Sequence, residues 1–323
     1  ETNSEHIKNY IFPAYAELKE GLTALRETGK NNNGLCHLPD GRKFYELTVA
    51  SETGSSRTIP ELQQLTQGQM FKDLTDMQKI LSPTAEGASV SSDLFKTQGT
   101  LLENPDPTAI LNDLQDKLTD NFPKPPKVNT EIKYVQKSME EYLSPAFYMI
   151  PAIDNPADNV IYINQGHLPD DLSLFTTLAH EGYPGHLYQT TYYASRKPDL
   201  IRNLLNYGGY VEGWATYCEM MSYYYAPVSK EQATLMQKNT SVILGLYALA
   251  DMGIHYEGWT LLDAVSFFRS YGITDTDTIE KIYDLIIADP ANYLKYYIGY
   301  VEFLEMKKEA LEAWGDDFSQ KKF

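Results

Sequence analysis

A histidine followed by a glutamate opens the stretch of this sequence that is best suited to chemistry. His180-Glu181 begins like the zinc-binding pattern His-Glu-x-x-His, in which two histidines on one helix face hold the metal and the glutamate polarises a water. Here the second histidine, His186, comes six residues after the first, on the far side of an unbroken helix. Pro184 and Gly185 can break that helix, and a kink that absorbs two residues returns His186 to the first face. We therefore predict an interrupted form of the zinc-binding pair.

A third protein ligand would complete such a site, and a predicted helix downstream carries two candidates. Glu212 and Glu219 are seven residues apart, so they share one face of a helix. Their neighbours are not typical of a solvated acidic face; they are Gly213, Trp214, Ala215 and Tyr217. A buried carboxylate needs a metal or another cation as its partner. The spacing alone leaves either glutamate open as the ligand.

Several motifs, in one order along the chain, resemble the bacterial domain-of-unknown-function family 885. They are Leu38–Gly41 with Phe44-Tyr45, His180–His186, Glu212–Ala215 with Tyr217 and Glu219, Asp251–Trp259, and Pro290–Gly299. The resemblance implies a mainly helical domain similar to the Glu-zincin metallopeptidases. Because members of this family are usually longer at the N-terminus, it also implies that this chain is the C-terminal, catalytic-type portion of a longer protein.

The resemblance further implies a role for each residue of the site. Glu212-Gly-Trp-Ala is similar to the ligand-bearing motif of zinc aminopeptidases, which favours Glu212 over Glu219. His180, His186 and Glu212 would then hold Zn²⁺, with one position open for a water whose pKa falls to about 7. Glu181 would deprotonate that water and pass the proton to the leaving amine. Glu219 would accept the free N–H of a ligating histidine.

Two more residues in the matched motifs are candidates for stabilising the oxyanion of the reaction. His255 and Tyr296 would donate hydrogen bonds to it, as a distal histidine and tyrosine do in helical metallopeptidases. The alternative for His255 is a helix-start residue that packs on Trp259 without any chemistry. Other tyrosines could replace Tyr296, namely Tyr293, Tyr297 and Tyr300.

The composition narrows the classes of partner. Lys and Arg number 27 against 44 Asp and Glu, a net charge of −17, which argues against nucleic acid and anionic membranes. No apolar run approaches the roughly 20 residues of a membrane span. Two cysteines are too few for a disulfide scaffold. An excess of tyrosine, 25 residues against 12 phenylalanines, fits a wet aromatic cleft.

These observations predict a zinc-dependent hydrolase, foremost a metallopeptidase that acts on a peptide substrate. Two other classes remain open: a non-catalytic module that binds peptide or glycan at the cell surface, and a zinc hydrolase of non-peptide amides or esters. The sequence does not distinguish endo- from exo-cleavage and leaves the oligomeric state open. We also expect an extracytoplasmic location, in the cell envelope or secreted, although this sequence contains no signal segment.

Elements of two kinds must position the site. Short strands are predicted at 131–135, 147–150 and 160–163, directly before the metal-binding helix, and an edge strand at 160–164 could pair with an extended peptide. The stiff segment at 123–126 is the predicted boundary between an N-terminal helical part, 1–126, and a metal-binding part, 127–323. These two parts are expected to form one continuous domain.

Apolar periodicity predicts helices over most of the remaining chain. A kink is expected at Pro13, a capping box at Thr58–Glu61 and a surface loop at 82–92. The expected helices are 5–30, 42–50, 58–81, 107–122, 170–182, 185–195, 199–225, 229–252, 255–270, 277–287 and 290–314.

Overall fold

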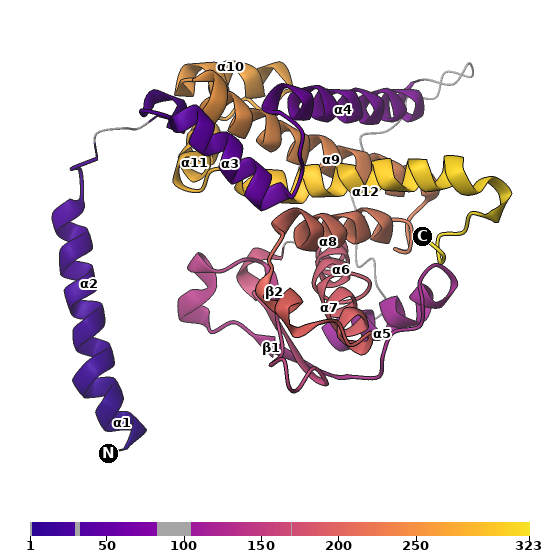
Figure 1. The fold of residues 1–323 in the computed structure, drawn as a ribbon, viewed down its shortest axis with the longest axis horizontal. Coiled ribbons are helices and arrows are strands. Elements are labelled where there is room, and N and C mark those ends of the chain that lie inside the picture. The colour runs from indigo at the N-terminus through magenta and orange to yellow at the C-terminus, as the bar shows by residue number, and fades with distance from the viewer. Residues whose placement is uncertain (1, 30–32, 83–104, 169) are drawn as a thin grey trace.

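The computed structural model describes residues 2–29, 33–82, 105–168 and 170–323, and it is mainly helical with one small sheet (Figure 1). The helices are α1 (Asn3–His6), α2 (Phe12–Leu25), α3 (Gly41–Thr53), α4 (Ile59–Leu81), α5 (Pro107–Lys117), α6 (Asp171–Glu181), α7 (His186–Ser195), α8 (Gly208–Ser222), α9 (Lys230–Met252), α10 (Leu261–Ser270), α11 (Thr276–Ala288) and α12 (Asn292–Trp314). The strands are β1 (Asn129–Tyr134), β2 (Ala146–Met149) and β3 (Asp158–Ile163). The class expected from the sequence is confirmed.

Two long helices form the centre of the fold. Helix α12 packs along α8, and on its other side it contacts α9, α3 and α4. Figure 1 shows α3, α4 and α9–α11 above α12, whereas α5–α7 and the sheet lie below α8. The helices α6, α7 and α8, which carry the predicted metal ligands, therefore lie in the lower layer, and α12 covers them.

The small sheet has the strand order β1-β3-β2. Strand β3 pairs in parallel with β1 and antiparallel with β2, so it is the central strand and not the edge strand expected at 160–164. The reason is that β1 and β2 occupy both of its sides, and its Ile161 and Ile163 side chains are buried. Strand β2 is the edge strand that lies next to α6.

Local signals in the sequence predicted several helix ends. Thr58 caps α4 through its side chain, and Glu61 bonds back to the Thr58 backbone, as the predicted capping box requires. The expected helix 199–225 is instead a short 3-10 turn, Leu200–Leu204, followed by α8, whose first two glycines lie close against the backbone of Glu52 and Thr53.

The expected helix 255–270 also begins later than predicted. Helix α9 continues as a π-helical turn, Gly253–Glu257, and ends at Gly258, which has a φ of 92°. Thr260 and Asp263 then form a second capping box at the start of α10. The sequence contains this capping signal, but the periodic apolar residues on both sides of it favoured one unbroken helix.

The N-terminal helical segment stands apart from the rest of the chain (Figure 1). A π-helical turn, Ile7–Ile11, joins α1 to α2, and Pro13 lies in the first turn of α2. The change in helix type therefore falls just before the predicted kink. No residue of α1 or α2 is buried. The predicted loop at 82–92 lies, apart from its first residue, outside the described residues.

Helices α8 and α12 approach closely because glycines meet where they cross. A Cβ atom added to Gly213 would lie 2.4 Å from the Cα of Gly299, and one added to Gly299 would lie 2.3 Å from the Gly209 carbonyl oxygen. Side chains cannot be accommodated at such distances without moving backbone. This contact therefore fixes the position of Tyr296 on α12 relative to Glu212 on α8.

Replacing Gly213 with alanine should lower the free energy of unfolding by about 1–3 kcal/mol, because the methyl group would overlap the Gly299 backbone. Gly68→Ala on α4 is the matched control, since nothing lies within 4 Å of the added Cβ. It should raise stability by up to about 1 kcal/mol through better helix propensity. Urea unfolding followed by circular dichroism measures both. Equal effects of the two substitutions would contradict the close contact.

A fully buried carboxyl group joins α3, α9 and α12. The Tyr45 hydroxyl donates to Asp251 at 2.5 Å, and the Ala291 N–H lies 3.1 Å from both carboxyl oxygens. Burial nevertheless raises the pKa of Asp251 to about 7. The folded protein therefore holds a proton on Asp251 at pH values where the unfolded chain has released it.

Because the folded protein holds this proton on Asp251, we expect its stability to depend on pH. Folding raises the pKa of Asp251 from its ordinary value of 3.8 to about 7. The contribution of Asp251 to the free energy of unfolding is therefore complete below pH 3.8 and is lost as the pH rises toward 7. Within that window, the free energy of unfolding of Asp251→Asn relative to that of the wild type should increase by up to about 1.4 kcal/mol for each unit by which the pH rises. Urea unfolding at pH 5, 6, 7 and 8 tests this. A difference between the two proteins that stays constant with pH would refute it.

Candidate metal centre

The predicted break between the two histidines is present. Helix α6 ends at Glu181 and α7 begins at His186, with Gly185 packed so tightly that a Cβ would lie 1.7 Å from the His180 carbonyl oxygen. Only glycine fits there. The peptide bond before Pro184 is cis. Across the break between α6 and α7, the His180 and His186 rings meet edge to face, with centroids 4.8 Å apart.

Helix α8 holds this break in place. The Trp214 indole N–H donates to the carbonyl oxygen of Pro184 at 2.9 Å, and the Cys218 thiol approaches the same oxygen at 3.5 Å. Trp214 and Cys218 are four residues apart, so they lie on one face of α8. Sequence reasoning noted Trp214 as a neighbour of Glu212 but assigned it and Cys218 no part in positioning the histidines. Their partner is a backbone carbonyl, which leaves no trace in the sequence.

Three side chains converge at this point. One carboxylate oxygen of Glu212 lies 3.6 Å from His180 Nε2 and 3.3 Å from His186 Nε2. Each of the three residues offers a ligand atom, and these atoms lie within 4.8 Å of one another. Bonds of 2.0–2.2 Å to a tetrahedral zinc place neighbouring ligand atoms about 3.4 Å apart. The donor types and the spacing therefore fit zinc.

Glu219 occupies a different position from Glu212. Its carboxylate oxygen lies 3.0 Å from His180 Nδ1, the ring nitrogen that faces away from the cluster. If a metal took the place of the Nε2 proton, a hydrogen bond from Nδ1–H to Glu219 would leave the Nε2 lone pair free toward Glu212 and His186. The two glutamates thus contact opposite nitrogens of the same ring.

The charges in the cluster depend on each other. Burial by itself lowers the pKa of His180, but hydrogen bonds to Glu212 and Glu219 outweigh this and hold it well above its usual value. Burial raises the pKa of Glu212, yet its contacts with His180 and His186 dominate and bring it far below the ordinary range. The largely buried Glu212 carboxylate is therefore ionised, and the two histidines are its partners.

Glu181 lies beside the cluster on the last turn of α6. Its carboxylate accepts a hydrogen bond from the backbone N–H of Tyr148, on edge strand β2, at 2.8 Å. Burial raises the pKa of Glu181, although His180 and His186 oppose the shift. A carboxylate with a raised pKa is a better proton acceptor than an ordinary one. The partner at Tyr148 was not predicted, because a backbone amide from another segment carries no sequence signal.

Tyr296 is brought to the same place by α12. Its ring stacks near that of His180, with centroids 6.4 Å apart, and the Lys295 ammonium lies 5.5 Å from the ring centre. Burial raises the pKa of Tyr296, and the nearby carboxylates of Glu212 and Glu181 add to the shift. Its hydroxyl therefore keeps its proton and can donate a hydrogen bond.

The alternative tyrosines lie elsewhere on α12. Tyr297 and Tyr300 are buried, and the negative charge of Asp73 adds to the effect of burial in raising the pKa of each hydroxyl. The Tyr300 hydroxyl accepts a hydrogen bond from Gln237 of α9. Tyr293 packs on Tyr247 of the same helix α9, with ring centroids 5.0 Å apart. Of the four tyrosines, Tyr296 is the one whose pKa is raised by the charges of Glu212 and Glu181.

The structure does not bring His255 to the cluster. This residue lies in the π-helical turn after α9, is 1% exposed and stacks on Tyr45. The Leu35 N–H donates to its Nδ1 at 3.1 Å, and its Nε2 donates to the Ile286 carbonyl oxygen at 2.8 Å. Both ring nitrogens are thus engaged by backbone groups. These contacts favour a structural role, and the oxyanion role expected of His255 stays a prediction; the ring stacks on Tyr45.

Comparisons with known proteins agree with this fold. A family model described as "Bacterial protein of unknown function (DUF885)" matches residues 1–323. The crystal structure of a "putative lipoprotein" from Colwellia psychrerythraea has a TM-score of 0.80 at 20% identity, covering 97% of this chain and 57% of that one. A "putative lipoprotein of unknown function" from Shewanella oneidensis has a TM-score of 0.68 at 20% identity, covering 95% and 60%. This chain therefore spans less than two thirds of either protein. No curated protein matches it.

Among the described residues, no helix combines the length and the apolar character needed to cross a bilayer.

Proposed function

Since the chain belongs to the family of bacterial proteins of unknown function DUF885, we propose its activity from its own site: it is a zinc-dependent hydrolase, foremost a metallopeptidase. The observation that carries this proposal is the convergence of His180 Nε2 and His186 Nε2 on one oxygen of Glu212, at 3.6 and 3.3 Å. These are the atom types and distances that a zinc site with three protein ligands requires. The adjacent Glu181 adds a base that a purely structural metal site does not need.

Each residue of the site would then have a separate role in the reaction. Zinc held by His180, His186 and Glu212 would supply a Lewis acid and an activated water. Glu181, held by the Tyr148 N–H, would accept the proton of the attacking water and hand it to the leaving amine. Tyr296 would donate its hydroxyl proton as a hydrogen bond to the oxygen that becomes negatively charged.

Edge strand β2 supports a peptide as the substrate. The Tyr148 N–H points away from β3 and toward Glu181, so the open side of β2 faces the proposed base. An extended peptide can add to such an edge through main-chain hydrogen bonds. This would align a substrate carbonyl beside Glu181 by contacts that every peptide can make. Amides and esters without a peptide backbone would lack them.

The proposal is tested by metal content and reversible inactivation. Elemental analysis of protein purified without chelators should find about one zinc per chain, and a chelator should abolish hydrolysis of a mixed peptide library. Adding zinc back should restore it. Protein that holds no zinc after loading would refute the metallopeptidase and favour a non-catalytic peptide- or glycan-binding module. Zinc-dependent cleavage of simple esters or amides, with no cleavage of peptides, would favour the non-peptide hydrolase.

The structural neighbours bear on location. Both proteins are described as putative lipoproteins, and a lipid-anchored protein is exported from the cytoplasm. We propose on this ground that the present protein also acts outside the cytoplasm, at the cell envelope. Fractionation of the source cells with an antibody against this chain tests the proposal, and recovery in the cytoplasmic fraction would contradict it.

A further inference from the structure

An open groove of about 1510 Å³ lies beside the metal centre. Its walls come from the loop after α3, the segment after β2, helix α7 with the loop that follows it, the start of α8, and α12. Pockets for small molecules usually measure about 300–1,000 Å³. The groove therefore has room for a longer ligand than a single small molecule.

The groove begins one helical turn from the proposed site on three helices. Each helix carries a lining residue three positions away from a site residue, and residues at that spacing share a helix face. The pairs are Gln189 after His186, Gly209 before Glu212, and Gly299 after Tyr296. The site residues themselves do not line the groove, so a chain bound at the metal centre would enter it about one helical turn away.

Large aliphatic side chains line the groove while remaining open to solvent. The segment after β2 contributes Ile150 and Ile153, which are 75% and 64% exposed. The loop between α7 and α8 contributes Leu200 and Leu205, which are 73% and 53% exposed. A single exposed leucine is ordinary, but a cluster of such residues in one concave surface marks a binding site.

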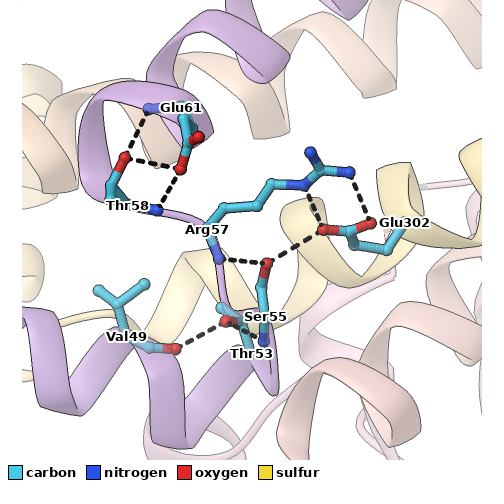
Figure 2. Close-up of polar contacts among 7 residues, drawn as sticks. All are labelled: Val49, Thr53, Ser55, Arg57, Thr58, Glu61 and Glu302. Atoms are coloured by element: carbon cyan, nitrogen blue, oxygen red, sulfur yellow. Dashed lines mark hydrogen bonds and ion pairs between the residues drawn. The ribbon is translucent and has the colours of Figure 1, made fainter.

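Among the described residues of the groove wall, the single acidic one is neutralised by an ion pair. Figure 2 shows that Arg57 reaches across to Glu302 of α12, with Nε 2.9 Å from one carboxylate oxygen. The Ser55 hydroxyl donates to the same oxygen at 3.1 Å. The other charged lining residues are both basic, Lys197 and Arg202. The groove therefore offers apolar contacts and no uncompensated negative charge that would attract a basic peptide.

We propose that this groove binds the residues on one side of the cleaved bond and selects extended peptides that carry bulky apolar side chains. The inference rests on the proposed peptidase function, because that function places the scissile bond at His180, His186 and Glu212. In an extended peptide alternate side chains point the same way. Every second residue of the bound segment therefore meets the aliphatic wall. Polar lining residues such as Gln189, Asn203 and Asn206 could bond to the peptide backbone between these apolar contacts.

Peptide binding tests the groove separately from catalysis. The probe is a fluorescein-labelled decapeptide with leucine at alternate positions, and its counterpart has serine at the same positions. Fluorescence anisotropy with the zinc-loaded Glu181→Gln variant, in which cleavage is suppressed, should show at least about tenfold tighter binding of the leucine peptide, since each buried leucine favours binding. Leu200→Asp should remove most of that preference. Leu262→Asp on α10 is the matched control, since Leu262 is 77% exposed and does not line the groove.

The outcomes separate the groove from the reaction. Equal binding of the two peptides, or loss of the preference in Leu262→Asp as much as in Leu200→Asp, would overturn the inference. Tighter binding of a labelled N-acetylglucosamine oligomer, weakened by Leu200→Asp, would overturn it in favour of a glycan site. A leucine peptide that binds through Leu200 but is never cleaved would support the groove and refute the peptidase. Cleavage of both peptides with the same kcat/KM would support the peptidase and refute the groove's preference for apolar side chains.

Discussion

Replacing Glu181 with glutamine should lower the rate of peptide hydrolysis by about 10²–10⁴-fold while zinc remains bound. Glutamine keeps the size of the side chain and an oxygen that can accept the Tyr148 N–H, which lies 2.8 Å from the carboxylate. It cannot take up the proton of the attacking water. The loss should therefore appear in kcat, with little change in KM for the substrate.

The matched control for this substitution is Glu309→Gln on α12, which removes the charge of an exposed glutamate away from the cluster. Its activity should equal that of the wild type. Zinc content, measured on the same Glu181→Gln sample, shows whether the metal site survived. Full activity with one zinc bound would mean that another group serves as the base. Loss of zinc would mean that Glu181 holds the metal, which the described contacts do not indicate.

The second large effect concerns the two glutamates of α8. Glu212→Gln should abolish zinc binding at metal concentrations that saturate the wild type, and activity should disappear with it. The physical reason is that the Glu212 carboxylate supplies both a ligand atom and the negative charge beside two histidines, at 3.6 and 3.3 Å. An amide oxygen carries no net charge and is a poor zinc ligand.

Glu219→Gln provides the comparison, since it is the same chemical change seven residues further along α8. Glu219 contacts His180 Nδ1 at 3.0 Å and none of the other ligands in the described contacts. Loss of such a supporting hydrogen bond costs about 10–100-fold in metal affinity or activity. Competition with a calibrated zinc chelator measures both variants. If Glu219→Gln lost more affinity than Glu212→Gln, the two roles would have to be exchanged.

Much of the local structure could be predicted from the sequence because its causes are local. Thr58 and Glu61 cap α4 through contacts three residues apart, and the break at Pro184 and Gly185 follows from the chemistry of proline and glycine. Predictions failed where two local patterns competed, as at the capping box of Thr260, or where partners were distant. The boundary proposed at 123–126 remains a prediction.

The order of the strands in the sheet could not be predicted from the sequence. A run of β-branched and aromatic residues identifies 160–163 as a strand, but it does not say how many neighbouring strands there are. The central position of β3 results from pairing with β1 on one side and β2 on the other. The open edge consequently belongs to β2, and this edge, not β3, brings a backbone N–H to Glu181.

The sequence by itself determined the set of groups able to bind zinc and the break that brings His186 to His180. The spacing could not choose between Glu212 and Glu219, because seven residues place both on one face of α8, and only the family resemblance favoured Glu212. Only the tertiary structure separated them, by setting one against Nε2 and the other against Nδ1 of His180. In the same way His255 matched its motif, yet backbone groups from two distant segments engage both of its ring nitrogens. The physical reason is common to these cases: the role of a side chain depends on which atoms meet it, and distant backbone atoms leave no pattern in the sequence.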